Sequence, residues 1–184
     1  MDWSAMFNAP VVVFGCGNTL FGDDGVAPAA VGELAREHAG EKHAAFVDAG
    51  TSIRSLLADL LLSGASPRRI VLVDAVMEPG REPGSIEEAR LEPAPKGGAE
   101  GLCGTALSLH QAPTPELLEA ARVRLGCDVR VLTVQGEHIP EAMEQGLSLA
   151  VSRAIPPLKR AILRLCQPPC GKPRGNDKSA RAGR

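Results

Sequence analysis

The stretch Val11-Val12-Val13-Phe14-Gly15-Cys16-Gly17-Asn18-Thr19-Leu20-Phe21-Gly22-Asp23-Asp24-Gly25 decides the fold of this chain. Its β-branched run at 11–14 predicts a buried strand, and the glycines that follow predict a tight loop. Helical spacing then appears in the apolar residues Val26, Ala30, Val31 and Leu34. A buried strand that passes through a tight loop into a helix is the unit from which parallel α/β sheets are built.

The same alternation of strand and helix recurs along the 184 residues. Further strands are expected at 44–47, 70–73, 85–91 and 129–134, the one at 85–91 being weak. Helices are expected after Ser52, from Thr114 and after Ser148, and Pro156-Pro157 should break or kink the last of them. Residues 77–104 are rich in Pro and Gly and predict a long loop. The fold class is therefore α/β, with a mostly parallel sheet between helices.

Composition and charge exclude several kinds of protein. Aromatic residues are scarce, with four Phe, one Trp and no Tyr, which disfavours a nucleic-acid platform of stacked bases. Residues 1–166 carry a net charge of −6 and residues 167–184 a net charge of +4, so we expect an acidic domain with a basic, disordered tail. Five cysteines without CxxC spacing disfavour a disulfide framework or a structural zinc site. No apolar run is long enough for membrane insertion, so we expect a cytoplasmic protein.

Acidic residues follow three of the predicted strands. Asp23-Asp24 lies in the loop after the first strand, Asp48-Ala49-Gly50-Thr51 follows the second, and Asp74 follows the third. In an open α/β sheet, ligands bind outside the carboxyl ends of the strands. If the first and third strands are neighbours, with the second outside, Asp24 and Asp74 open onto one crevice. The alternative for each aspartate is a simple helix or turn cap, and one member of the Asp23-Asp24 pair is expected to do only that.

His110 lies between the Gly/Pro-rich loop and a predicted helix start. With Asp24 and Asp74 it would form an O,O,N ligand set that can hold a divalent metal and leave coordination positions open. His138, after the last strand, is a weaker candidate. Nucleophilic catalysis is disfavoured because the chain lacks a G-x-S-x-G elbow, and Cys16 is interpreted as a small buried residue. A nucleotide cofactor is disfavoured because Leu20 stands where a dinucleotide-binding loop needs its third glycine.

The segment from Val12 to Val26 closely resembles the opening signature of the hydrogenase maturation protease family. Further matches occur in the right order at Asp48–Thr51, Val71–Ala75, Ser108–Gln111, Gly136 and Gly146–Ser148. The resemblance covers about residues 10–166 and implies a twisted sheet between helices, a three-layer α/β/α domain. It departs from the family pattern at Ala27, where glycine is usual, and at Leu109, where proline commonly precedes the histidine.

The resemblance implies an endopeptidase that removes the C-terminal extension of a nickel-loaded [NiFe]-hydrogenase large-subunit precursor. The family's metal-contact positions correspond to Asp24, Asp74 and His110, and the nickel ion would come from the precursor and not from the free enzyme. Asn18, Gly50 and Thr51 are the expected substrate contacts, and the enzyme is expected to be a monomer. Two alternatives stay open: a non-catalytic nickel-dependent assembly checkpoint or chaperone, and a small-molecule hydrolase or phosphorylase on a related scaffold.

Overall fold

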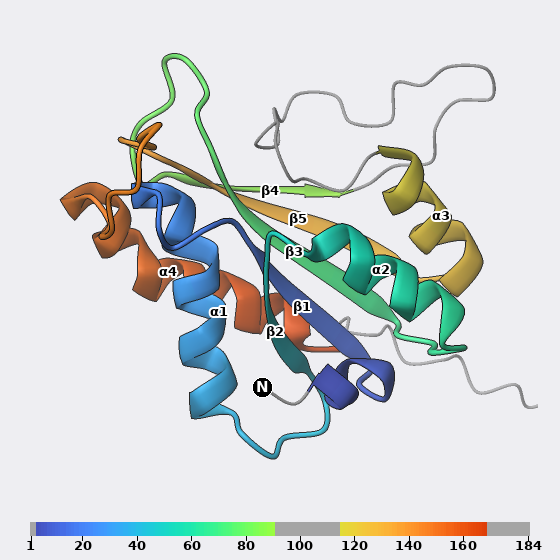
Figure 1. The fold of residues 1–184 in the computed structure, drawn as a ribbon. Coiled ribbons are helices and arrows are strands. Elements are labelled where there is room, and N and C mark those ends of the chain that lie inside the picture. The colour runs from blue at the N-terminus through green and yellow to red at the C-terminus, as the bar shows by residue number, and fades with distance from the viewer. Residues whose placement is uncertain (1–2, 91–114, 169–184) are drawn as a thin grey trace, which may run out of the picture.

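A single five-stranded sheet forms the centre of the chain in the computed structural model, which describes residues 3–90 and 115–168 (Figure 1). The strands are β1 (Val11–Cys16), β2 (Ala45–Gly50), β3 (Arg69–Val76), β4 (Ile86–Arg90) and β5 (Asp128–Gln135), arranged in the order β2-β1-β3-β5-β4. Only β4 runs antiparallel to its neighbour. The prediction of a mostly parallel sheet, with the first and third strands adjacent and the second outside, is confirmed.

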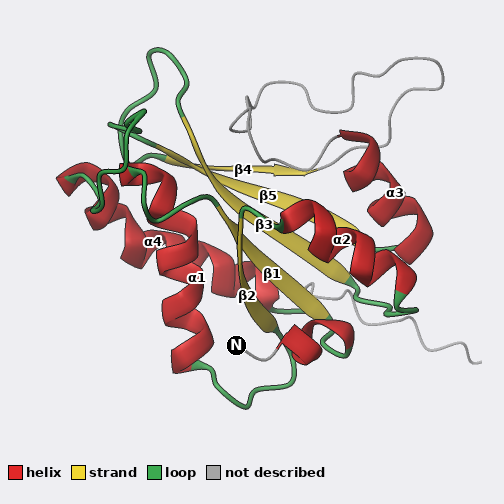
Figure 2. Ribbon diagram, in the orientation of Figure 1, coloured by secondary structure: helices red, strands yellow, loops and turns green. Residues whose placement is uncertain are grey.

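Helices cover both faces of this sheet, so the predicted three layers are confirmed (Figure 2). The helices are α1 (Val26–Glu37), α2 (Ile53–Leu62), α3 (Pro115–Leu125) and α4 (Leu149–Cys166), with short 3-10 turns η1 (Trp3–Phe7) and η2 (Gly22–Gly25). The pair α1 and α4 packs on one face, and the pair α2 and α3 packs on the other. None of the helices within the described ranges is both long and apolar enough to cross a membrane.

The central position of β1 explains its continuous apolar sequence. All six of its residues are buried, because helices cover both faces of the sheet and a strand lies on each side. Val12 and Phe14 pack into the core beneath α2 and α3, whereas Val11 and Val13 pack into the core beneath α1 and α4. The strand is therefore held in register by apolar contacts on both faces, which fixes the loop that follows it.

Several strands extend further than the sequence predicts, among them the two that contain Asp48 and Asp74. The expected second strand ends at residue 47, but β2 continues to Gly50, and the expected third strand ends at residue 73, but β3 continues to Val76. Pairing with the neighbouring strand continues through these residues, as in the register of Asp74 opposite Thr133. Asp48 and Asp74 therefore lie within the last residues of their strands and not after them.

The predicted break in the last helix and the predicted side-chain cap at Ser52 are wrong. Helix α4 runs unbroken from Leu149 to Cys166 through Pro156-Pro157, so of the predicted break or kink the break is contradicted and the kink stays a prediction. Buried residues lie on both sides of the prolines, and this packing outweighs the loss of two helix N–H donors. Ser52 precedes α2 but its side chain accepts no capping hydrogen bond, whereas Ser148 caps α4 by accepting one from the Val151 backbone N–H at 3.3 Å.

Several predictions concern segments outside the described residues. The loop expected over 77–104 is described only to Arg90, and it contains β4 where a weak strand is predicted. His110 and nearly all of the basic tail also fall outside the described ranges. The proposed division into a 1–166 domain and a 167–184 tail therefore stays a prediction.

Candidate active site

Asp74 is a buried carboxylate near the carboxyl end of β3. Its side chain is only 4% exposed, and its Oδ1 accepts a hydrogen bond from the Ala75 backbone N–H at 2.9 Å. Burial, and secondarily the negative charge of Asp24, raise the pKa of Asp74 from 3.8 to about 7. This carboxyl group therefore exchanges a proton near neutral pH, which is a common property of catalytic and metal-binding groups.

Asp24 lies in η2, directly after the loop that follows β1. Its Oδ2 accepts a hydrogen bond from the Asn18 backbone N–H at 2.7 Å, and its side chain is half-buried. Partial burial raises the pKa of Asp24, and the bond from Asn18 opposes that rise. Because the charge of Asp24 also raises the pKa of Asp74, the two carboxylates lie within electrostatic reach of each other.

The glycine in the loop between β1 and η2 is required by the position of Asp24. Gly17 has a φ angle of +121°, in the region that L side chains rarely adopt. A Cβ atom at this position would lie 2.0 Å from the backbone oxygen of Asp24, far inside van der Waals contact. The spacing from Gly17 to Asp24 therefore folds the loop back on itself and holds the carboxylate close to the end of β1.

Asp23 has a structural role that differs from that of its neighbour. Its side chain is fully buried, and its Oδ2 accepts hydrogen bonds from the backbone N–H groups of Glu137 at 2.8 Å and His138 at 2.9 Å. Its Oδ1 accepts a third bond, from the N–H of Ser148 at 2.7 Å. One member of the acidic pair is thus structural, as predicted, but it anchors the loop after β5 and the start of α4 and does not cap its own helix.

Cys16 and a third carboxylate lie beside this pair. Burial raises the pKa of the Cys16 thiol well above its ordinary value, and the charges of Asp74, Asp24 and Asp48 raise it further. Cys16 is therefore a neutral buried thiol, in agreement with the sequence interpretation. Asp48, whose Oδ1 accepts a hydrogen bond from the Gly50 N–H at 3.1 Å, was not among the predicted site residues. Its place at the end of a parallel strand is the signal that could have included it.

A small surface pocket of about 260 Å³ is lined by Asp48 and adjoins Asp24 through Asn18, whose N–H donates to Asp24 Oδ2. It brings together the three residues predicted to contact substrate, Asn18, Gly50 and Thr51. Gly50 has a φ angle of +49° and its carbonyl accepts a hydrogen bond from the Gly17 N–H at 3.1 Å, so the loops after β1 and β2 are joined at the pocket floor. The full lining is Gly17, Asn18, Thr19, Pro28, Asp48, Gly50 and Thr51.

The histidines divide into one that is not described and three that are. His110, the predicted third ligand, lies outside the described residues, so its position relative to Asp24 and Asp74 stays a prediction. His138 Nε2 lies 3.4 Å from Glu144 Oε2, and His38 and His43 each contact Glu41 at 3.0 Å. Within residues 3–90 and 115–168, no group of three His, Cys, Asp or Glu side chains is placed to hold a metal ion.

Two clustered carboxylates with raised pKa values can act chemically in two ways. A divalent cation between them would relieve their mutual repulsion and favour the ionised form of both. Without a cation, a carboxylate that titrates near pH 7 is suited to general acid–base catalysis. In both cases the reactive oxygens lie at the carboxyl edge of β1 and β3, next to the pocket formed by Asn18, Gly50 and Thr51.

A mostly parallel sheet between two helical layers places this chain in the class of open α/β proteins, whose ligands bind at the carboxyl ends of the strands. Residues 28–165 match the family described as hydrogenase maturation protease. Since this match spans more than half of the sequence, the chain belongs to the hydrogenase maturation protease family, whose members are endopeptidases. The match includes Asp74 and begins after Asp24.

Curated relatives agree with this assignment. The chain is 30% identical over 161 residues to the coenzyme F420 hydrogenase subunit delta of Methanothermobacter thermautotrophicus, covering 85% of this chain and 94% of that protein. It is 28% identical over 155 residues to the hydrogenase 2 maturation protease of Escherichia coli, covering 83% and 88%.

Solved structures confirm the fold. The [NiFe] hydrogenase maturation protease HycI from Thermococcus kodakarensis superimposes with a TM-score of 0.65 at 21% identity, covering 85% of this chain and 91% of that one. The hydrogenase maturating endopeptidase HybD from Escherichia coli gives a TM-score of 0.64 at 22% identity, covering 84% and 90%. At these identities the likeness supports the α/β fold alone.

Proposed function

We propose that this chain is the endopeptidase that removes the C-terminal extension of a nickel-loaded [NiFe]-hydrogenase large-subunit precursor. Membership of the maturation protease family and the relative named hydrogenase 2 maturation protease support the reaction class. The single observation that carries the site assignment is the buried Asp74 near the carboxyl end of β3, next to β1, whose following loop holds Asp24 through the 2.7 Å bond from the Asn18 N–H. The protein acts as a monomer in the cytoplasm and has no tightly held metal ion of its own.

The nickel ion belongs to the substrate in this proposal. Asp24 and Asp74 supply two carboxylate oxygens, and His110 supplies an imidazole nitrogen, so the precursor's nickel completes the ligand set. Binding of the cation lowers the pKa of Asp74 from about 7 and so fixes it as a carboxylate. A precursor without nickel lacks the ion that joins these side chains, which is why the enzyme would process only the loaded form.

Peptide hydrolysis at this site requires an activated water or a polarised carbonyl. The oxygen of water bonds to the scissile carbonyl carbon, the C–N bond breaks, and the leaving nitrogen takes a proton. The nickel ion can polarise the carbonyl or lower the pKa of water, and a carboxylate can act as the general base. Asn18, Gly50 and Thr51 hold the substrate backbone in the adjoining pocket of about 260 Å³.

A cleavage assay on the large-subunit precursor, prepared with and without nickel, tests this proposal. Mass spectrometry should show loss of a C-terminal peptide only from the nickel-loaded precursor. Asp24→Asn and Asp74→Asn should each reduce kcat/KM by roughly 100-fold or more, because each removes one charged ligand. Asp59→Asn, an exposed aspartate on α2, is the matched control and should cleave at the wild-type rate.

Three outcomes would count against the proposal in different ways. Equal cleavage of loaded and empty precursor would refute nickel-dependent selection. Stable binding of the precursor without loss of any peptide would support the checkpoint alternative. Full activity of both aspartate variants would refute the site and favour a different hydrolase chemistry.

A further inference from the structure

A groove lies between α1 and β2 and adjoins the candidate active site. This α1–β2 groove has a volume of about 800 Å³. Its lining includes the small residues Ala29, Gly32 and Ala35 of α1, together with Phe46 and Asp48 of β2. Pro28 and Asp48 line both this groove and the smaller pocket at the site, so the two hollows are neighbours.

The groove follows an open sheet edge. Within residues 3–90 and 115–168, β2 pairs with β1 only and has no strand on its outer side. Alternate residues of a strand turn their N–H and C=O groups to opposite edges, so the outer groups of β2 can pair with an added strand. Six residues of β2, at about 3.4 Å each, can pair with roughly six residues of extended chain.

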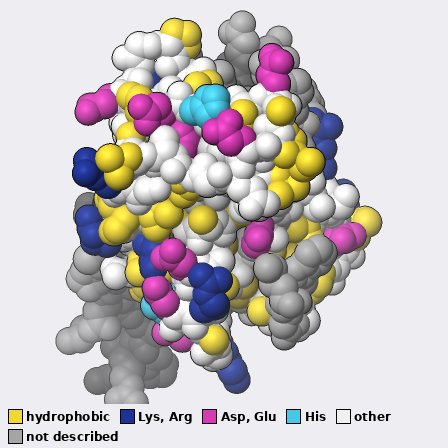
Figure 3. Space-filling view, turned by 60° about the vertical axis from the view of Figure 1, so that its left-hand side comes forward, with side chains coloured by type: hydrophobic (Ala, Val, Ile, Leu, Met, Phe, Trp, Pro, Cys, Tyr) yellow, Lys and Arg dark blue, Asp and Glu magenta, His cyan; other side chains and the backbone are white. Residues whose placement is uncertain are grey.

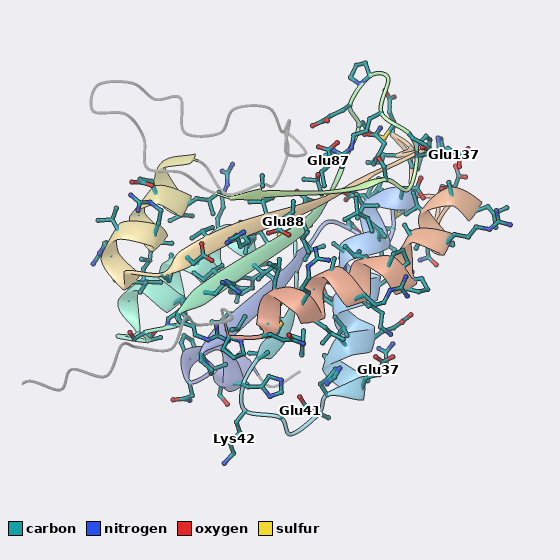
Figure 4. The ribbon with its side chains drawn as sticks, turned by 180° about the vertical axis from the view of Figure 1, so that it is seen from behind. Glu37, Glu41, Lys42, Glu87, Glu88 and Glu137 are labelled. Carbon is teal, nitrogen blue, oxygen red and sulfur yellow. The ribbon has the colours of Figure 1, made fainter. Side chains whose placement is uncertain are left out.

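The two ends of the groove differ in charge. Asp48 lies at the end next to the site, whereas Arg36 and Lys42 lie at the far end. Figure 4 shows Glu37, Glu41 and Lys42 together at that far end, opposite Glu137 near the site. The acidic groups of the groove have partners, since Lys159 Nζ contacts Glu33 at 2.8 Å, and His38 and His43 contact Glu41 at 3.0 Å each. Arg36 and Lys42 are therefore suited to receive a carboxylate.

We propose that the α1–β2 groove binds the precursor's C-terminal extension as an added strand that runs antiparallel to β2. This inference rests on the proposed function, which places the scissile bond at Asp24 and Asp74. The extension follows that bond in the chain, so it leaves the site at Gly50 and runs toward Ala45. Its terminal carboxylate then reaches the Arg36 and Lys42 end of the groove.

This arrangement gives the enzyme two separate contacts with its substrate. Backbone pairing with β2 tolerates many sequences, because main-chain hydrogen bonds supply the affinity in strand addition. Figure 3 shows hydrophobic side chains interspersed with charged ones on the side of α1 and α4, without one dominant charge. The groove therefore suits an extended peptide of mixed composition.

Gly32 offers a substitution that fills the groove with little effect on the fold. A Cβ atom on Gly32 would meet only the Arg36 Nη1 atom, at 3.7 Å, which is ordinary contact with a flexible side chain. Gly32→Phe should raise the KM for nickel-loaded precursor at least tenfold with little change in kcat. Arg153→Phe, at an exposed position on α4, is the matched control and should stay within twofold of wild type. A folded Gly32→Phe protein with wild-type KM would overturn the proposal.

A binding measurement separates this inference from the proposed function. The probe is a fluorescein-labelled synthetic peptide with the sequence of the precursor's C-terminal extension, and binding to the full chain is followed by anisotropy. Wild type should bind, Gly32→Phe should bind at least tenfold more weakly, and amide exchange at 45–50 should slow in the complex. Equal peptide binding by both proteins, or unchanged amide exchange at residues 45–50, would overturn the proposal that the groove binds the extension. This holds even if the wild type cleaves the precursor.

If the wild type does not cleave the precursor, the proposed function is refuted. The peptide measurement still decides whether the α1–β2 groove binds the extension. If Gly32→Phe does not fold, Arg36→Glu replaces it, since Arg36 is exposed at the far end of the groove. Arg36→Glu should bind the peptide at least threefold more weakly, and the difference should shrink for the same peptide with an amidated C-terminus. Equal binding of the acid peptide by Arg36→Glu and wild type would overturn the proposal.

Discussion

Neighbouring carboxylates in this chain have different tasks because their surroundings differ. Asp23 is buried with three backbone N–H donors, and Asp24 is half-buried with one, from Asn18. A carboxylate that accepts several amide hydrogen bonds is fully engaged and serves as an anchor. A carboxylate that keeps an oxygen available near a second carboxylate can bind a cation or a proton. The surroundings of each side chain therefore separate the anchoring role of Asp23 from the site role of Asp24.

Removal of the Asp23 side chain should destabilise the protein strongly. Asp23→Ala leaves three backbone N–H groups, those of Glu137, His138 and Ser148, without their acceptor. Each buried donor left unpaired costs roughly 1–3 kcal/mol, so we expect a loss of about 3–5 kcal/mol in the free energy of unfolding. Urea denaturation followed by circular dichroism measures it. A loss below about 1 kcal/mol, as expected for the exposed Asp59→Ala, would contradict the anchoring role.

Asp74 should make the stability of the metal-free protein fall as pH rises. Its pKa is about 7 in the folded state against 3.8 as the ordinary value, so protonation favours folding. This contribution is fully present below about pH 4 and is lost as pH rises through 7. One pKa unit corresponds to about 1.4 kcal/mol, so the free energy of unfolding of the wild type should fall by roughly 2–3 kcal/mol between pH 5 and pH 8. Asp74→Asn should not show this fall. Urea unfolding of both proteins at the two pH values measures the difference.

Asp59→Asn provides the control for this comparison, because it removes an exposed carboxylate and should follow the wild-type pH dependence. Parallel curves for wild type and Asp74→Asn would mean that Asp74 is ionised in the folded protein at pH 5. Nickel-dependent selection would then lose the physical basis that the raised pKa of Asp74 provides.

At the scale of elements, the loop from β1 to η2 is constrained by backbone contact more than by side chains. Gly17→Ala combines a positive φ of +121° with a Cβ only 2.0 Å from the Asp24 backbone oxygen. The loop must therefore move, and Asp24 with it. We expect at least 2–3 kcal/mol of destabilisation, by the scale of strained backbone positions and overpacking, and roughly 100-fold or greater loss of cleavage.

Gly64→Ala is the matched control for strain without contact. Gly64, between α2 and β3, has a φ of +74°, and nothing lies within 4 Å of its Cβ position. This substitution should cost about 1 kcal/mol through the positive φ alone and leave cleavage unchanged. Thermal unfolding and the precursor cleavage assay separate the two variants. Similar behaviour of Gly17→Ala and Gly64→Ala would show that the contact with Asp24 does not shape the loop.

Local sequence patterns predicted the existence of the strands and helices well, but predicted the residues at which they end less well. The apolar runs at 11–14 and 70–73 predicted β1 and β3, because burial on both faces leaves an unmistakable continuous pattern. The last residues of β2 and β3 include Asp48 and Asp74, which propensity places in a turn but pairing with the neighbouring strands keeps extended. Pro156-Pro157 also predicted a break that the packing of α4 overrides.

At the scale of the whole molecule, the sheet order brings together segments that are distant in sequence. The strand order β2-β1-β3 brings the carboxyl ends of β1 and β2, and the segments that follow them, to the same edge of the sheet as Asp74. The rule that ligands bind at the carboxyl ends of parallel strands was enough to predict the Asp24 and Asp74 pairing. The contribution of Asp48 to the charge around Cys16 depends on register, with Gly15 opposite Asp48, and could not be derived from spacing alone.

The boundary of the folded unit can be tested by truncation at the end of α4. Arginines before and in β3 hold this end of the helix: Arg68 donates to the Cys166 carbonyl at 2.8 Å and to the Gln167 carbonyl at 3.4 Å, and Arg69 donates to the Leu165 carbonyl at 2.6 Å. A chain that ends at Pro168 keeps these bonds and all of the buried face of α4. It should therefore unfold within about 2 °C of the full chain, since small changes outside a core contribute a few tenths of a kcal/mol.

A chain that ends at Pro157 provides the opposite case. It loses the buried residues Leu158, Ala161, Ile162, Leu165 and Cys166, which pack against α1 and the sheet. Loss of a buried Leu or Ile side chain costs roughly 2–5 kcal/mol, so together these losses are comparable to the 5–15 kcal/mol that holds a typical domain folded. Circular dichroism should show cooperative unfolding for the 1–168 chain and none for the 1–157 chain. Loss of cooperative unfolding or of precursor cleavage in the 1–168 chain would instead assign the basic segment to the folded enzyme.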